Sequence, residues 1–284
     1  MTRRFGLIAG GGLAIGAIAA GLVPRSETDR DASRVVAVHA GGGAVPSNLL
    51  RVYVELSAPM EPGSAHDHIR LVDDSGRVMA GAFLELREEL WSNDHRRLTL
   101  WFDPGRVKRG IQSNLEFGSP LVAGREYAIV IDSSWRDAAN RPLASTFTQR
   151  LRVGAFDSIS PDPTRWSISS PRVGSRDALR VDFGESLDHG LASRMISVLG
   201  ASNAPLAGHV TLSDADRVWR FTPAAPWRRE GTLRVNPALE DLAGNNLARR
   251  FDVDRSRGDP SIATAMTDTA PRLIRVRMER FGKL

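Results

Sequence analysis

The sequence predicts an all-β protein built from two antiparallel β-sandwiches in series, and three observations support this prediction. Short apolar runs alternate with polar residues, and turn residues separate them about every ten to fifteen positions. No amphipathic helical pattern of about twelve or more residues interrupts these runs. Three segments of the first half recur, in the same order, in the second half.

The alternation is clearest over residues 50–56, where every second residue is aliphatic. Successive side chains of an extended strand point to opposite faces, so Leu50, Val52, Val54 and Leu56 share one face and are expected in the core. Residues 83–91 alternate in the same way and are also expected to form a strand. Further short strands are predicted at 69–71, 98–102 and 127–131.

The recurrence pairs residues 50–54 with 179–183, 98–104 with 217–223, and 137–143 with 241–247. A closing strand then follows in each half, at 151–153 and at 251–253. The offset between the copies falls from 129 to 104 residues, so the first copy has 25 additional residues, near 84–96 and 106–124. Insertions of this kind lengthen loops rather than change the core.

These boundaries predict a domain order. It runs as a signal peptide or membrane anchor (1–25), a linker (26–34), a first sandwich with loop insertions (35–157), a proline-rich hinge (158–165), a second sandwich (166–254) and a C-terminal tail (255–284). The tail contains alternating Ile274, Val276 and Met278, which can add an edge strand to a sheet or pair with another chain.

Two related turns precede the predicted closing strands. In the second half, Asp241 can accept bonds from its own turn, Gly244 supplies a positive φ and Asn245 follows. In the first half, Asp137 and Asn140 occupy the matching places. Calcium binding by these oxygens is an alternative, but the turn chemistry alone explains the residues.

A family resemblance follows from two motifs. Residues 45–60, ending in Leu56-Ser-Ala-Pro-Met60, resemble the opening strand of the SbsA-type bacterial Ig-like domain. The turn from Asp241 to Leu247 is similar to the closing turn of that family. The resemblance covers 45–153 well and 166–254 less well, since Glu185-Ser-Leu187 replaces Ser-Ala-Pro-Met. It implies Ig-like sandwiches, which serve as spacers and binding units of surface proteins.

The N-terminus has the features of an export signal. Arg3 and Arg4 precede residues 5–23, which contain no charge. A cleaved signal and an uncleaved anchor both remain open. Either one places the rest of the chain in the periplasm, outside the cell, or anchored outside the cytoplasm.

Composition excludes several chemistries. The chain has 284 residues and no cysteine, which excludes disulfides, thiolate metal sites and thiol nucleophiles. The formal charge is only +5, and acidic residues lie among the arginines throughout, so no nucleic-acid partner is expected. The sequence also lacks a nucleophile elbow, a phosphate loop and a dinucleotide fingerprint, and no enzyme activity or cofactor is predicted.

The segment from His66 to His68 is a candidate metal site. His66, Asp67 and His68 would place two imidazoles on one face of an extended strand, and His39, His95 or Asp94 could supply a third ligand. An exposed polar turn explains the same residues. The preferred interpretation is therefore a turn, with no metal ligand assigned.

The insertion at 106–118 is the preferred recognition loop, because loops on a rigid β scaffold commonly bind partners. It combines positive and apolar side chains. The candidate partner-binding residues are Arg106, Lys108, Arg109, Ile111, Leu115, Phe117 and the nearby Trp91. A loop packed over the first sandwich is the alternative.

The function predicted from these observations is an exported, non-catalytic interaction or structural module. Its expected partner is a protein of the envelope or surface, or a polysaccharide, and it would touch a membrane only through an uncleaved N-terminal segment. A carbohydrate-binding module is the first alternative. A metal-dependent hydrolase is the second.

Overall fold

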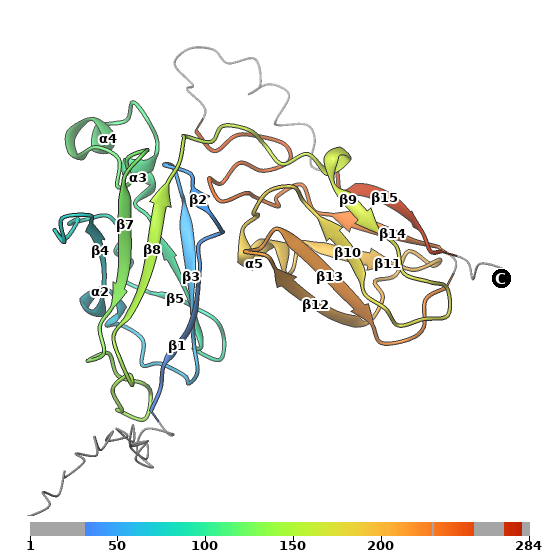
Figure 1. Cartoon of the computed structure of the whole chain (residues 1–284), viewed down its shortest axis with the longest axis horizontal. Helices are drawn as coiled ribbons and strands as arrows, with labels where there is room; N and C mark the ends of the chain where they lie inside the picture. The colour runs from blue at the N-terminus through green and yellow to red at the C-terminus, as the bar shows by residue number, and fades with distance from the viewer. Residues whose placement is uncertain (1–31, 229, 253–269, 280–284) are drawn as a thin grey trace, which may run out of the picture. The chain divides into compact units, whose positions relative to one another are not determined.

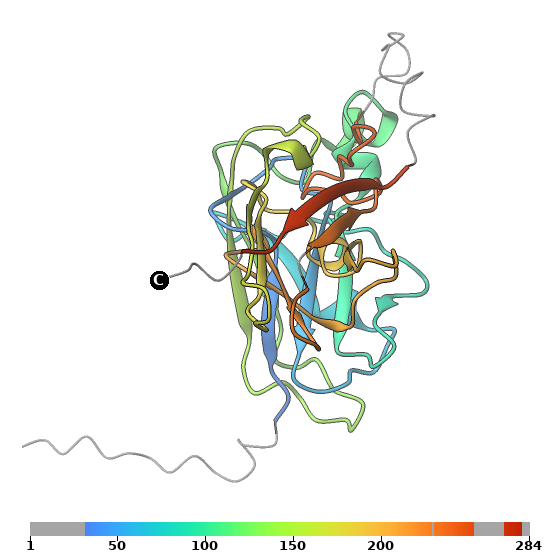
Figure 2. The same cartoon turned by 90° about the vertical axis from the view of Figure 1, so that its right-hand side faces the viewer.

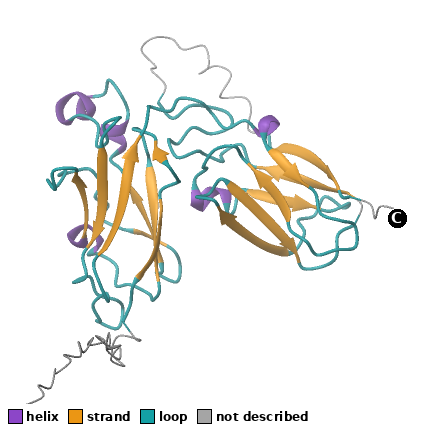
Figure 3. Cartoon of the chain, in the orientation of Figure 1, coloured by secondary structure: helices purple, strands orange, loops and turns teal. Residues whose placement is uncertain are grey.

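The structure is a computed structural model, and it describes residues 32–228, 230–252 and 270–279. Figures 1 and 3 show strands throughout this part of the chain, with short helices at the strand ends. The predicted fold class is confirmed: the described residues form two Ig-like β-sandwiches, here called sandwich 1 and sandwich 2.

Sandwich 1 consists of two four-stranded sheets. The first has the order β1 (Val35–His39), β3 (Arg51–Leu56), β6 (Arg97–Trp101), β5 (Leu90–Trp91). The second has the order β2 (Ala44–Val45), β8 (Phe147–Val153), β7 (Glu126–Ile131), β4 (Ile69–Asp73). All pairings are antiparallel except the short parallel contact between β2 and β8.

Sandwich 2 repeats this arrangement with fewer strands. One sheet has the order β9 (Ser167–Ser169), β10 (Leu179–Asp182), β13 (Val218–Pro223), β12 (Gly208–Ser213). The other has the order β11 (Ile196–Leu199), β14 (Glu230–Val235), β15 (Arg272–Arg277). In this order β10 occupies the place of β3, and β15 occupies the place of β8.

The inward-facing residues of the alternating segment 50–56 form part of the core of sandwich 1. Val52 and Val54 are fully buried between the sheets, and Leu56 is 4% exposed. Ile129 and Ile131 of β7 face them from the opposite sheet and are also fully buried. Burying such aliphatic side chains contributes about 1.5–3 kcal/mol each to stability. Trp135 and Trp219 are fully buried in the cores of sandwiches 1 and 2 respectively.

The helices are single turns or little more, and aspartates begin several of them. They are α2 (Ala65–His68), α3 (Pro104–Val107), α4 (Gln112–Phe117), the 3-10 turn η1 (Pro163–Arg165) and α5 (His189–Ala192). The Asp103 carboxylate accepts from the Gly105 backbone N–H, and the Asp188 carboxylate accepts from the Leu191 N–H. An aspartate in this position satisfies a backbone donor that has no partner inside the helix.

Two predicted strands differ from the structure. Over 83–91, only Leu90–Trp91 belongs to a strand, and Phe83 makes a single bridge to Phe102. The predicted closing strand 251–253 is also absent where it is described, since Phe251 and Asp252 lie in a bend. Residue 253 lies outside the described residues.

The strand that closes sandwich 2 comes from the predicted tail. β15 pairs with β14 over six residues, from Glu230 opposite Arg277 to Val235 opposite Arg272. Figures 1 and 2 show β15 beside β14 from two sides. Val276 is 3% exposed and packs into the core of sandwich 2. The alternation noted at 274–278 therefore belongs to this sheet.

The predicted export signal and most of the predicted first linker fall within residues 1–31, which lie outside the described residues, as do residues 255–269 of the predicted tail. In the part of the chain that the structure describes, no helix is both long and apolar enough to cross a membrane.

Candidate functional site at the junction of the sandwiches

The outer face of β3 meets sandwich 2. Because Val52 and Val54 point inward, Arg51, Tyr53 and Glu55 point outward. His39 lies opposite Tyr53 in the β1–β3 ladder and joins the same outer face. Arg51 and Tyr53 are 8% and 5% exposed, which is unusual for an outer face and shows that another element covers them. That element is α5 of sandwich 2, with residues near it.

Arg51 is the centre of a buried ionic network. Its guanidinium donates to the carboxylates of Asp188 and Glu240, both in sandwich 2. The Tyr53 hydroxyl donates to the second oxygen of Asp188 at 2.6 Å. Trp101 of β6 lies under the guanidinium, with its ring centroid 4.8 Å from Cζ. Since Asp188 is 2% exposed, removing Arg51 would leave a buried charge without its cation.

The electrostatics follow from this burial. Burial alone lowers the pKa of Arg51, but the nearby Asp188, Tyr53 and Glu240 together outweigh it, and the net pKa is raised. Burial, together with the Asp188 charge, raises the pKa of Tyr53. Burial raises the pKa of Glu240, although Arg51 opposes it. The network therefore keeps Arg51 charged and the Tyr53 hydroxyl protonated.

Glycines allow the two sandwiches to approach closely. A Cβ at Gly190 of α5 would lie 2.6 Å from the Tyr53 ring. A Cβ at Gly42 would lie 2.5 Å from the Cβ of Ala215 in sandwich 2. Backbone bonding adds to this contact, since the Leu50 N–H donates to the Leu242 carbonyl at 2.9 Å. Larger side chains at these glycines would force the surfaces apart.

A second cluster of polar side chains lies next to this network. The imidazoles of His39 and His189 are stacked, with ring centroids 3.6 Å apart and planes 19° apart. His39 Nε2 lies 3.4 Å from Glu55 Oε2, and His189 Nε2 lies 3.7 Å from Glu55 Oε1. His189 Nδ1 lies 2.8 Å from Asp216 Oδ1, and Asp216 is 4% exposed.

The turn that carries Asp216 is strained. Asp214, Ala215 and Asp216 connect β12 to β13 with φ values of +54°, +52° and +66°. Left-handed backbone costs a residue with a side chain about 1–2 kcal/mol. The surrounding structure maintains this conformation, which places the Asp216 carboxylate against His189.

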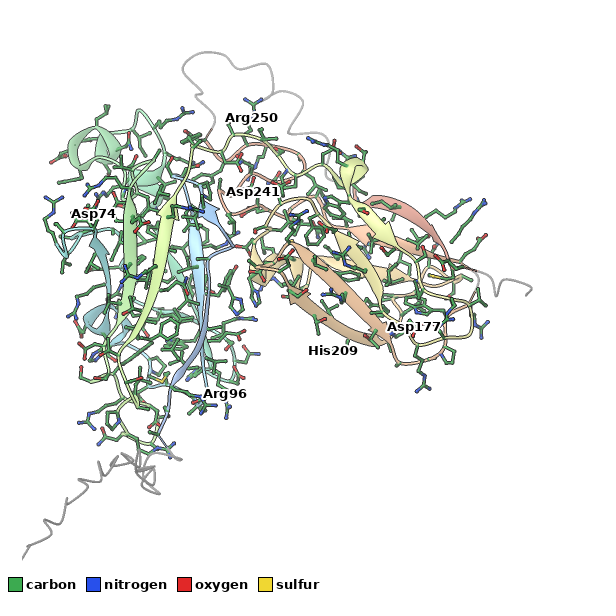
Figure 4. The ribbon with its side chains drawn as sticks, in the orientation of Figure 1. Asp74, Arg96, Asp177, His209, Asp241 and Arg250 are labelled. Atoms are coloured by element: carbon green, nitrogen blue, oxygen red, sulfur yellow. The ribbon has the colours of Figure 1, made fainter. Side chains whose placement is uncertain are left out.

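A third cluster contains only carboxylates. The oxygens of Asp157, Glu185 and Asp241 lie within 4.8 Å of one another. Burial, followed by the charge of Asp157, raises the pKa of Glu185 to about 7. Burial also raises the pKa of Asp241 to about 7, against the hydrogen bond from Asn245. Figure 4 labels Asp241. The next residue of its turn, Leu242, accepts a backbone hydrogen bond from Leu50 of sandwich 1.

The two predicted Asp turns have the expected local chemistry. Asp241 Oδ1 accepts from the Ala243 and Asn245 backbone N–H groups, and Gly244 has a φ of +81°. Asp137 Oδ1 accepts in the same way from its own turn, where Asn140 has a φ of +62°. In both turns, backbone N–H groups therefore donate to an aspartate oxygen that would have to coordinate the ion if the turn bound calcium.

The predicted recognition loop differs from expectation at Arg106. This side chain is 7% exposed, and its guanidinium donates to the carbonyls of Ala80, Gly81, Phe117 and Gly118. Arg106 therefore holds the loop together and is not available at the surface. A charged residue in a loop predicts exposure, but the carbonyls of the two surrounding turns accept from this guanidinium and so keep it buried.

The other loop residues divide into two groups. Arg109 is bonded to Asp252 at 2.7 Å and stacks on Phe156, and Lys108 Nζ lies 4.5 Å from the Phe251 ring centroid. In contrast, Ile111, Leu115 and Phe117 on and beside α4 are 41%, 75% and 62% exposed. The apolar residues of the prediction are thus at the surface, and Arg109, although its side chain is 61% exposed, is paired with Asp252.

Trp91 lies apart from this loop. Its indole N–H donates to Glu89 at 2.7 Å, and its ring packs 5.8 Å from Trp135. Together with Trp101 it lines an open hollow of about 620 Å³, which Arg97 and Arg194 border. This hollow is the feature that the carbohydrate alternative would use.

The two histidines of the candidate metal site, His66 and His68, are not brought together with a third ligand among the described residues. His66 and His68 lie on α2, and His68 Nδ1 lies 3.2 Å from the Ser134 hydroxyl. His39 instead lies beside His189, 150 residues later in the chain. The sequence does not predict that His39 meets His189 and Asp216, because no local spacing links β1 to a helix of the other sandwich.

No known protein-family profile matches the sequence, and no protein of curated function is similar to it. Solved structures show a distant likeness. An S-layer protein, SbsC, is 12% identical with a TM-score of 0.30, over 72% of this chain and 23% of that one. An alpha-2-macroglobulin fragment from Escherichia coli spanning domains MG0-NIE-MG1 is 9% identical with a TM-score of 0.28, over 88% and 91%.

A biofilm-associated protein (BSP domain) is 11% identical with a TM-score of 0.25, over 87% of this chain and 30% of that one. Similarities with such low TM-scores do not indicate a shared function. The SbsA-type resemblance in particular stays a prediction.

Proposed function

We propose that the protein is an exported, non-catalytic structural and interaction module of the cell envelope or cell surface. The observation that supports this is the junction, where buried Arg51 joins Asp188 and Glu240 across two sandwiches. A spacer that presents a binding surface needs its modules coupled, and a buried ion pair with close backbone contact provides such coupling. The uncharged segment 5–23 supports export.

In this proposal the contact surface is on sandwich 1. Ile111, Leu115 and Phe117 expose apolar area around α4, and such patches on a soluble domain mark interaction sites. The partner is a protein of the envelope. Lys108 and Arg109 anchor the loop through Phe251 and Asp252 and so present α4 to that partner.

Site-specific crosslinking in living cells tests this proposal. A photoreactive amino acid replaces Leu115, and a matched control replaces Ile159, which is 70% exposed and lies outside α4. We expect a discrete adduct with one envelope component at position 115 and none at 159. Adducts with cytoplasmic proteins, or equal adducts at both positions, would contradict the proposal.

The coupling is tested separately with Gly190→Ala. Its Cβ would meet the Tyr53 ring at 2.6 Å, whereas a Cβ at Gly231 has no neighbour nearer than 3.4 Å, so Gly231→Ala is the control. Since the chain has no cysteine, two introduced cysteines can carry spin labels, one in each sandwich. We expect a broadened distance distribution in Gly190→Ala only; an unchanged one would show that the contact does not couple the sandwiches.

Carbohydrate binding is the second candidate, favoured by the hollow beside Trp91 and Trp101. Aromatic faces bordered by arginines suit sugar rings with acidic groups. Retention on immobilised envelope polysaccharide, lost in Trp91→Ala and kept in Val78→Ala, would favour this function over protein contact, since Val78 is 52% exposed and does not line the hollow.

A further inference from the structure

We propose that His39, His189 and Glu55 bind one divalent transition-metal ion of the zinc type, and that this ion links sandwich 1 to sandwich 2. His39 ends β1, Glu55 lies in β3, and His189 begins α5. Three elements of two sandwiches therefore bring their ligand atoms to one place. This inference is independent of the proposed surface function.

The spacing fits a single ion. Nitrogen and oxygen ligands at about 2.0–2.1 Å from zinc lie about 3.3–3.4 Å from each other in a tetrahedral site. The two histidine–carboxylate distances are 3.4 Å for His39 and 3.7 Å for His189. All three donor atoms lie within 4.8 Å of one another. The donor atoms are therefore close enough to share one ion once the two imidazole rings turn toward it.

Asp216 determines which nitrogen of His189 is free. Its carboxylate Oδ1 lies 2.8 Å from His189 Nδ1, and a carboxylate can only accept, so Nδ1–H is the donor. This arrangement leaves His189 Nε2 as the nitrogen that can bind a cation, and Nε2 lies 3.7 Å from Glu55 Oε1. One cation between these two atoms could be bound by both. A carboxylate behind a ligating histidine is the usual arrangement in zinc sites.

His39 provides an independent sign. Its Nε2 is fully buried and has no hydrogen-bond partner among the residues that the structure describes. Burying a nitrogen without a hydrogen-bond partner is unfavourable, and a bound cation would give this nitrogen a partner.

The donors select the kind of cation. Two imidazoles and one carboxylate suit zinc, copper, nickel or cobalt, whereas calcium and magnesium need sets of oxygen ligands. Glu55 and Asp216 contribute two negative charges, which a divalent ion balances. Glu55 is 35% exposed at its side chain and so opens the site to solvent.

Binding changes the histidine stack. An imidazole lone pair lies in the plane of its ring, and the two planes are only 19° apart. Both lone pairs can reach one ion only when the rings tilt. Loading should therefore break the stack and shift the ring signals of both histidines in nuclear magnetic resonance spectra.

The test uses the full chain, freed of metal by a chelator and titrated with Zn²⁺ by calorimetry at pH 7.5. We expect one equivalent to bind and the melting temperature to rise with the Zn²⁺ concentration. Mg²⁺ should not bind. Asp216→Asn should weaken Zn²⁺ binding about 10–100-fold, as expected for the loss of an orienting partner.

Three variants each remove one ligand: His39→Ala, His189→Ala and Glu55→Gln. Each should weaken binding more than Asp216→Asn does. His209→Ala is the matched control, because His209 is exposed on β12, where Figure 4 labels it, and is not near the cluster. Circular dichroism without metal checks that each variant folds, and Glu55→Gln serves if a histidine variant does not.

A tetrahedral visible spectrum with Co²⁺, lost in Glu55→Gln and kept in His209→Ala, would support the site. Absence of Zn²⁺ binding by the wild type would overturn the proposal. So would binding that the ligand variants leave unchanged.

Discussion

β3 and β10 share an Arg-Val pair at matching positions and have equivalent places in their sheets, but their outer faces differ. Inward, Val52 and Val181 are both fully buried. Outward, Arg51 is buried and bonds to Asp188 of the other sandwich, whereas the side chain of Arg180 is 35% exposed and bonds to Asp182 of its own strand at 2.9 Å. The local pattern determines the inner face. The outer face is determined by whatever domain covers it.

The two aspartate turns differ in the same way. Burial raises the pKa of Asp137, but the Ser33 hydroxyl and the Arg141 backbone and side chain outweigh it, and the net pKa is lowered. In the matching turn, burial dominates at Asp241 and Asn245 stands where the other turn has Arg141. The same turn therefore holds a stable carboxylate in one sandwich and a disfavoured one at the junction.

The largest expected effect separates the two arginines. Arg51→Ala leaves Asp188 charged and buried, and should lower the free energy of unfolding by about 3–5 kcal/mol. Arg180→Ala breaks a half-exposed pair and should change it by at most about 0.5 kcal/mol. Urea denaturation at pH 7.5 measures both. Similar losses in the two variants would mean that the outer faces do not differ energetically.

The second prediction separates the two aspartates at pH 8. Asp137→Asn weakens bonds to Arg141 and Ser33 and should cost about 2 kcal/mol of unfolding free energy. Asp241→Asn removes a charge that its surroundings disfavour, so it should cost less than about 1 kcal/mol. Thermal and urea unfolding would check the order. A larger loss of unfolding free energy in Asp241→Asn than in Asp137→Asn would contradict the proposed difference between the two turns.

The smallest effect is a pH dependence at the junction. The pKa of Glu185 is about 7 in the fold and 4.5 ordinarily, so the fold prefers the protonated acid. Its contribution to stability is complete below pH 4.5 and is lost as pH rises toward 7. Glu185→Gln should therefore be more stable than the wild type at pH 8, by about 1 kcal/mol after allowing for solvent screening.

At pH 4.5 the two proteins should unfold at the same urea concentration. Arg180→Ala is a useful reference here, since it should shift stability equally at both pH values. A constant difference between Glu185→Gln and wild type across this range would show that Glu185 does not titrate with the fold.

Much of the fold follows from local pattern. The alternation of 50–56 predicts which residues enter the core, and Asp137 and Asp241 predict their turns, because these depend on neighbours in the chain. The sequence pattern predicts the closing strand of sandwich 2 at 251–253, whereas β15 lies at Arg272–Arg277. Residues 251–253 and 272–277 both have the short alternating pattern of a strand. Only the pairing with β14 shows which of the two segments closes the sheet.

The junction could not be predicted in this way. Arg51 and Asp188 are 137 residues apart, and each is an ordinary charged residue in its own segment. Their contact depends on how two folded sandwiches meet, which hydrophobic periodicity does not encode. The exposed apolar residues of α4 were predicted because an insertion in a β scaffold is visible in the sequence.

The burial of Arg51 has a consequence for ionic strength. At about 0.15 M salt the Debye length is about 8 Å, and exposed pairs such as Arg125–Asp74 are screened by counter-ions. Counter-ions cannot reach Arg51 and Asp188, which are 8% and 2% exposed. Their attraction therefore persists in brine and in dilute medium alike, and the two sandwiches stay joined by this pair while pairs on their surfaces weaken and strengthen with the surrounding electrolyte.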